Sequence, residues 1–153
     1  MYRVSFLTIC ALAISACTAP ENETPVALQA GLYEVTLGGG TLVELKSGER
    51  TAQVCLDETA AHYFPADPLA PLIERWENCA FEAEPRQGNA ISGARQCDQR
   101  AMPMRAAYTG TLATDSFELK GEVTQSNDEG GGVMHLGSGE FSLTGKRIGD
   151  CTA

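Results

Sequence analysis

The six cysteines are the residues whose type and spacing could do chemistry in this chain. Two fall within the first 17 residues, and four are spread over the remainder: Cys55, Cys79, Cys97 and Cys151. None of them has Cys-x-x-Cys spacing, and no histidine cluster accompanies them, which disfavours both a zinc site and a thioredoxin-like redox centre. We therefore expect no metal site and two structural disulfides among the four later cysteines.

The start of the chain resembles the signal of a bacterial lipoprotein. Arg3 provides a positive charge, residues 4–14 form an apolar run, and Ile14-Ser15-Ala16-Cys17 is similar to a lipobox. The run is well short of the roughly 20 residues that span a bilayer. We expect residues 1–16 to be a signal peptide and Cys17 to become the lipidated first residue. A plain secretory signal is the alternative.

These features predict a protein of the cell envelope, lipid-anchored and facing the periplasm. Thr18 follows the lipidated cysteine, where lipoproteins kept in the inner membrane often have Asp, so the sequence favours the outer membrane. The chain has 20 acidic and 11 basic residues, a net charge of −9. Such a balance argues against nucleic-acid partners and against attraction to anionic head groups. The predicted membrane contact is therefore the lipid on Cys17.

Residues 17–29 contain Pro20, Pro25 and few apolar side chains, which is typical of a flexible tether. From Ala30 onward the pattern changes, and residues 30–153 are expected to form a single β-rich domain. Apolar residues alternate with polar ones in three segments, as expected for half-buried antiparallel strands. The apolar positions are Tyr33, Val35 and Leu37; Phe117, Leu119 and Val123; and Phe141 and Leu143.

Between Cys55 and Cys79 the apolar spacing changes to that of a helix. Asp57 could cap a short helix, and Asp67-Pro68 begins a second one whose apolar residues would include Leu69 and Trp76. Pro71 limits this second helix to a turn or two. The predicted fold is thus mainly β. It is a curved antiparallel sheet or half-barrel of about six to eight strands, with a short helical crossover over about residues 57–77 and two disulfides.

Four cysteines allow three connectivities, and the sequence favours one of them. The segment from Cys79 to Cys97 is symmetric about Gly88, which lies in an Arg-Gln-Gly-Asn turn. A hairpin centred there would place the two cysteines directly opposite each other, within disulfide distance. Cys55 and Cys151 then pair by elimination and tie an early strand to the end of the domain.

The opening residues Ala30-Gly31-Leu32-Tyr33-Glu34-Val35-Thr36 and the ending Gly145-Lys146-Arg147-Ile148-Gly149-Asp150-Cys151 resemble those of a bacterial envelope family. This family is known only as a domain of unknown function, number 3617. The order of the four cysteines is also similar, and the resemblance covers about residues 30–151. It implies a small β-rich domain and brings no catalytic residues.

No catalytic motif is present, so we do not expect an enzyme, and the sequence indicates no cofactor. His62 and His135 are the only histidines, and neither lies in a Gly-x-Ser-x-Gly or His-Glu-x-x-His motif. The carboxylate pairs Asp57-Glu58 and Asp128-Glu129 are adjacent in sequence, and adjacent strand residues point to opposite faces. No ligand-binding residue is identified by this reasoning.

Two functions remain. The first is a small binding or interaction domain displayed from the membrane to an envelope protein. The second is a carrier of a small apolar ligand on the concave face of the sheet. A cavity lined by Tyr33, Phe117 or Phe141 would favour the carrier. A filled core with an exposed apolar patch would favour a protein partner.

Overall fold

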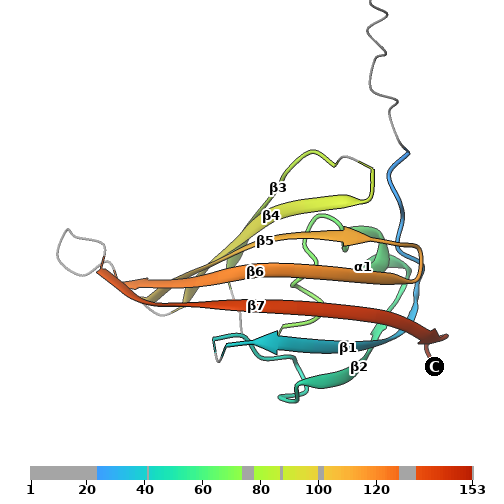
Figure 1. Cartoon of the computed structure of the whole chain (residues 1–153), viewed down its shortest axis with the longest axis horizontal. Helices are drawn as coiled ribbons and strands as arrows, with labels where there is room; N and C mark the ends of the chain where they lie inside the picture. Colours follow the sequence, from blue (N-terminus) through green and yellow to red (C-terminus); the bar gives the residue numbers. More distant parts are fainter. Residues whose placement is uncertain are drawn as a thin grey trace, which may run out of the picture.

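The computed structural model describes residues 24–40, 42–73, 78–86, 88–99, 102–127 and 134–152. Within these ranges the chain forms seven strands and one helix (Figure 1). The strands are β1 (Gly31–Gly39), β2 (Thr51–Leu56), β3 (Cys79–Ala83), β4 (Ala90–Gln99), β5 (Met102–Leu112), β6 (Ser116–Asn127) and β7 (Met134–Gly149), and the helix is α1 (Glu58–Tyr63).

All seven strands belong to one antiparallel sheet with the order β2-β1-β7-β6-β5-β4-β3. The first and last strands in this order do not pair with each other, so the sheet is open and β2 and β3 are its edges. The fold class predicted from the sequence is therefore confirmed, including the strand number, the short helix and both disulfides. No helix in the described ranges is long and apolar enough to cross a membrane.

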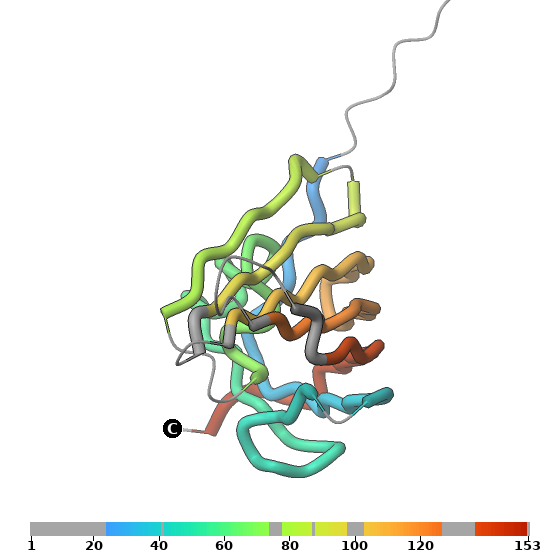
Figure 2. The backbone as a smooth tube through the Cα atoms, turned by 90° about the vertical axis from the view of Figure 1, so that its left-hand side faces the viewer, coloured from blue at the N-terminus to red at the C-terminus, as the bar shows by residue number. Residues whose placement is uncertain are grey.

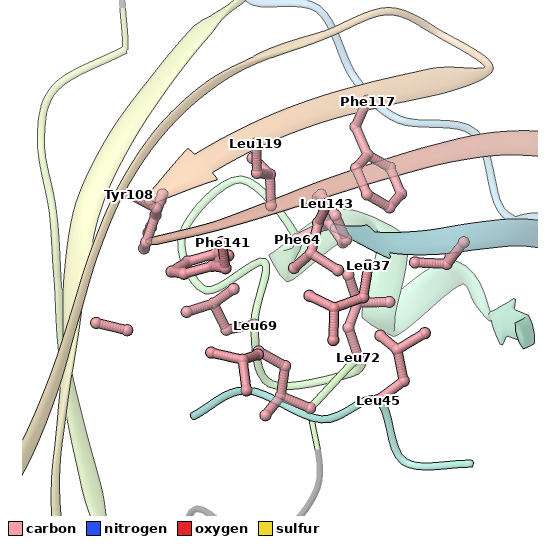
Figure 3. Packing of buried hydrophobic residues seen from close by; sticks show 14 of the residues in the cluster. Leu37, Leu45, Phe64, Leu69, Leu72, Tyr108, Phe117, Leu119, Phe141 and Leu143 are labelled. Atoms are coloured by element: carbon pink, nitrogen blue, oxygen red, sulfur yellow. The ribbon is translucent and has the colours of Figure 1, made fainter. Parts of the chain in front are cut away.

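The sheet curls around a covering segment, residues 42–50 and 57–73, which flanks β2 in the sequence and includes α1 (Figure 2). The predicted alternating residues of β1, β6 and β7 all point to this side and are buried. The covering segment contributes the opposite half of the core, with Val43, Leu45, Phe64, Leu69 and Leu72 also buried. Figure 3 shows the two sets facing each other. The concave face of the sheet is thus the inside of a packed core.

The domain begins before Ala30. Leu28 falls within the predicted tether, but it is 6% exposed and belongs to the core. The Gln29 amide donates to the Thr114 carbonyl at 2.8 Å, and the Tyr33 hydroxyl donates to the Gln29 carbonyl at 2.6 Å. The sequence did not predict this because Val26, Ala27 and Leu28 form an apolar run of only three residues, which is too short to show a helix or strand period. The tether boundary at residue 29 is therefore placed too late.

The crossover between β2 and β3 contains one helix and one turn in its described residues, where the sequence predicted two short helices. Asp57 caps α1 as predicted, with the Ala60 amide donating to its carboxylate at 2.7 Å. The second predicted helix is a turn, closed by the Ile73 amide donating to the Leu69 carbonyl at 2.9 Å. Pro71 lies within this turn and has no amide hydrogen to extend it. Trp76 lies outside the described residues.

Candidate functional site

The cysteines pair as the hairpin argument predicts. Cys79 lies opposite Cys97 in the register of β3 and β4, with their Cα atoms 4.0 Å apart, and the two form a disulfide. Cys55 of β2 and Cys151 form the second disulfide, with a Cα separation of 5.5 Å. The turn at Gly88 has a φ of 58°, a left-handed conformation that glycine adopts readily. The predicted lipidation site, Cys17, lies outside the described residues.

The polar residues weighed as catalytic candidates do not assemble into a centre in the described part of the chain. His62 is exposed on α1 and contacts the ring of Tyr63, with centroids 5.1 Å apart. Asp57 is used as the helix cap, and His135 belongs to β7. No group of three His, Cys, Asp or Glu side chains among these residues is placed to hold a metal ion.

The aromatic residues proposed as cavity markers are in the core instead. Tyr33, Phe117 and Phe141 are 0%, 2% and 3% exposed. The Phe117 ring lies 4.6 Å from that of Phe64 and 6.1 Å from that of Tyr33, measured between centroids. The described residues therefore fill the concave face where these side chains lie.

An apolar hollow lies beside this core, between α1, the turn after it and β3. It has a volume of about 570 Å³, and its lining includes Asp57, Ala60, Tyr63, Asp67, Pro71 and Phe81. We call this surface the aromatic hollow. Tyr63 is 63% exposed and Phe81 is 53% exposed, although both are large apolar side chains. Exposed aromatic side chains gathered at one hollow are typical of a binding surface.

Local packing places both aromatic residues at this surface. Phe64 is fully buried, so the preceding residue, Tyr63, is turned away from the core at the end of α1. Phe81 is on the face of β3 that carries Cys79, the same side as the core, because side chains alternate along a strand. β3 is an edge strand with no strand beyond it, and Phe81 is left exposed.

The wall of the aromatic hollow is held to the sheet by two polar contacts. The Asp67 carboxylate pairs with the Arg95 guanidinium of β4 at 3.1 Å, and both side chains are 14% exposed. The Tyr108 hydroxyl of β5 donates to the Ala66 carbonyl at 3.0 Å. Together these contacts fix the turn that carries Ala66 and Asp67. The hollow therefore has one rigid wall, and it offers apolar contact and carboxylate charge.

Burial of Tyr108 makes stability sensitive to alkaline pH. Desolvation, with a smaller contribution from the nearby Asp67 carboxylate, raises the Tyr108 pKa to about 12. The unfolded chain then loses this proton near pH 10, before the folded chain does. We expect stability from Tyr108 to be complete below about pH 10 and to be lost as pH rises towards about 12.

Between about pH 10 and about pH 12, the free energy of unfolding should fall less in the Tyr108→Phe variant than in the wild type. At neutral pH it should lose about 1 kcal/mol, since the Ala66 carbonyl loses its donor. Urea unfolding at several pH values measures both effects. The Tyr63→Phe variant is the control, because its side chain is exposed. An unchanged pH dependence in Tyr108→Phe would contradict the assignment.

The sheet has a second hollow, on the face away from the core. It has a volume of about 560 Å³ and lies over β5, β6 and β7, with Lys120, Glu122 and Glu140 among its lining residues. Glu122 and Glu140 lie directly opposite each other in the register. This surface is charged and solvated, and its large aromatic neighbours Tyr108 and Phe141 are buried on the other side. It lacks the exposed aromatic side chains of the aromatic hollow.

Sequence reasoning did not identify Tyr63 or Phe81 as site residues. They lie in different elements, 18 residues apart, and neither is part of a motif. One feature of the sequence pointed to Phe81: it lies on the same strand face as Cys79, and the face that carries the disulfide was expected to be apolar. Its exposure depends on β3 being an edge, which follows from the strand order alone.

The fold and the site together define a small β-sheet domain: an open antiparallel sheet cross-linked by two disulfides, with an apolar surface beside one edge. The model of the family described as "Protein of unknown function (DUF3617)" matches residues 28–151. The chain belongs to this family. The match begins at Leu28, the first core residue in the described part of the chain. Comparisons with curated proteins and with solved structures find no match.

Proposed function

We propose that this protein is a lipid-anchored interaction domain of the bacterial cell envelope that binds a partner protein through the aromatic hollow. One observation carries the proposal. The concave face is filled by core side chains, whereas Tyr63 and Phe81 remain exposed together at an apolar hollow. An exposed apolar patch beside a complete core favours a protein partner over an enclosed small ligand.

The alternative, a carrier with a ligand pocket on the concave face, has less support. Such a pocket would need Tyr33, Phe117 or Phe141 to line free space, and these side chains are buried against Phe64 and other core residues. The aromatic hollow, the other apolar surface considered for a small ligand, is open to solvent on the side of Tyr63 and Phe81. We therefore place the carrier second.

The anchor in this proposal is the lipid on Cys17, and it would keep the domain near the membrane. Val26 is already held to the domain, because its carbonyl accepts a hydrogen bond from Arg86. The segment from Cys17 to Val26 would reach at most about 30 Å when fully extended. A partner in or on the same membrane would therefore meet the domain at a high effective concentration.

The anchor is tested by the intact mass of the protein extracted from membranes. We expect a chain that begins at Cys17 and carries the added mass of several acyl chains, since a single chain anchors only marginally. The Cys17→Ser variant is the control and should appear in the soluble envelope fraction. An unmodified chain, or one that starts at another residue, would remove the anchor from the proposal.

The binding surface is tested by photocrosslinking in the native membrane. A photoreactive phenylalanine analogue is placed at Tyr63 or Phe81 in the full-length protein, with a third version at Ile148. Ile148 is a matched control because it is also a large exposed hydrophobic residue, 47% exposed, near the other end of the chain. We expect one adduct of the same defined mass from positions 63 and 81 and a much weaker one from 148.

Equal crosslinking from all three positions would contradict the proposal, because it would show only random encounters. An adduct with a lipid or a small molecule, in place of a protein, would favour the carrier.

A further inference from the structure

We infer that the free edge of β3 accepts an extended segment of the partner protein as an added strand. Apolar residues of that segment enter the aromatic hollow, and basic residues lie beside Glu82. This inference rests on the proposed function and specifies how the partner binds. Addition of a strand to an open sheet edge is a recurrent mode of peptide recognition, with main-chain hydrogen bonds giving affinity and side-chain pockets giving specificity.

The edge of β3 is open. β3 is last in the strand order, it pairs only with β4, and four of its five residues are exposed. The Glu84 amide donates to the Ser92 carbonyl at 3.0 Å, which fixes the hydrogen-bonding phase of this hairpin. Because the phase alternates in antiparallel pairs, the backbone groups of Phe81 and Ala83 point away from β4. The 4.0 Å Cα separation of Cys79 and Cys97 agrees with this phase, since the pairs without hydrogen bonds are the closer ones.

The backbone groups that face outward therefore belong to Phe81 and Ala83. Within the described ranges, neither residue makes a hydrogen bond beyond the pairing with β4. Unpaired edge groups of this kind are a template for another strand. The structure thus offers donors and acceptors at the edge next to an apolar surface.

The aromatic hollow lies on the correct side of this edge. The side chain of Phe81 points to the concave side and lines the hollow together with Pro71 and Tyr63. In an added strand, the residue beside Phe81 would project to the same side, because neighbouring strands share their alternation. A large apolar side chain at that position would cover Phe81 and contact Tyr63.

The charge of the edge favours a basic partner. Glu82 is exposed on the outer face of β3 and forms no ion pair in the described ranges, although Arg105 borders the same surface. Residues 78–85 include Glu82 and Glu84 and no basic residue, and the whole chain carries a net charge of −9. Opposite charges on adjacent strands stabilise their pairing. The partner segment is therefore one in which apolar and basic residues alternate.

The other edge lacks these features. β2 is also an outer strand, but its exposed residues are Thr51, Gln53 and the disulfide-bonded Cys55. The Leu37 amide donates to the Arg50 carbonyl, so by the same alternation the Gln53 amide faces outward. No exposed large hydrophobic residue belongs to β2. It therefore provides a matched control for β3.

The test uses the full-length protein in detergent micelles and a defined probe, the acetylated peptide amide Lys-Val-Lys-Phe-Lys-Val-Lys. Binding is measured by isothermal calorimetry, and amide exchange is followed at Phe81 and Ala83. The Ala83→Pro variant removes one outward amide without breaking a bond to β4, because proline is tolerated on edge strands. We expect it to weaken binding at least about tenfold, the factor that 1.4 kcal/mol corresponds to. The Gln53→Pro variant on β2 should bind the peptide like the wild type.

A second measurement is independent of protein folding. Two versions of the peptide are methylated on alternate backbone amides, so that each version loses the donors of one edge. Strand addition uses one edge of the peptide, and we expect one version to lose binding and the other to keep it. An unmethylated peptide with Glu in place of Lys should bind more weakly than the lysine peptide.

The outcomes separate this inference from the proposed function. If both methylated peptides and Ala83→Pro bind normally while a Tyr63→Ala/Phe81→Ala variant does not, strand addition is wrong and the hollow remains the binding surface. If none of these changes alters binding or crosslinking, both proposals fail. If the peptide does not bind and the protein instead dimerises in a way that Ala83→Pro abolishes, the edge serves a second copy and the inferred partner is wrong.

Discussion

Replacing Cys55 and Cys151 together by alanine is expected to lower the free energy of unfolding by about 4.7 kcal/mol. The two cysteines are 96 residues apart, so their bond closes most of the domain into one loop. In the chain-entropy model, a loop of that length restricts the unfolded chain more than a short one does. Their bond also joins edge strand β2 to the end of the chain.

The matched control is the Cys79→Ala/Cys97→Ala variant, whose loop spans 18 residues. It should lose about 3 kcal/mol on the same model. Urea unfolding of both variants under oxidising conditions gives the comparison. A larger loss for the short loop would mean that native packing around Cys97, which is fully buried, matters more than loop length.

The second large effect concerns Phe117 and Gly145, which lie opposite each other in the register of β6 and β7. Phe117 packs over the glycine, and a Cβ atom on Gly145 would lie 2.1 Å from Cε1 of the ring. Phe117→Ala should cost about 4 kcal/mol of stability, because it empties the space between Phe64 and Tyr33. Gly145→Ala should cost about 3 kcal/mol, because the ring must move into a packed core.

The Phe117→Ala/Gly145→Ala double variant tests whether the Phe117 ring is the reason that position 145 requires glycine. When residue 117 is already alanine, the added methyl group at residue 145 meets no ring. The stability loss of the double variant should therefore be about 2 kcal/mol smaller than the sum of the two single losses. Gly137→Ala in the same strand is the control, since nothing lies within 4 Å of a Cβ atom there. Strictly additive losses in urea unfolding would show that the contact between Phe117 and Gly145 is not what requires glycine.

The sheet was predictable because one of its faces is buried. Alternation in β1, β6 and β7 identified the core residues from Tyr33 to Leu143, since a one-residue shift would expose every apolar side chain. The hairpin register was predictable because two cysteines flank Gly88 symmetrically. The alternation depends on residues close in sequence, and the hairpin register depends on a covalent link. Both can therefore be predicted without knowing the strand order.

The covering segment and the aromatic hollow were not predictable in the same way. Val43 and Leu45 are buried and alternate with the exposed Glu44 and Lys46, but this stretch is too short to predict a strand, and Leu45 forms only an isolated bridge to Ile73. The hollow joins α1 to β3, and whether Phe81 is covered depends on which strand is the edge. Strand order is set by contacts between distant segments, and those leave no local pattern.

The lipid anchor and the binding surface can be tested together, because the lipid on Cys17 would hold the aromatic hollow close to its partner. The most direct measurement is the crosslinking yield from a photoreactive residue at Phe81, compared between the native chain and a Cys17→Ser variant in living cells. We predict one protein adduct of defined mass in the native chain and a much lower yield in the variant. Equal yields, or no protein adduct from position 81, would contradict the account.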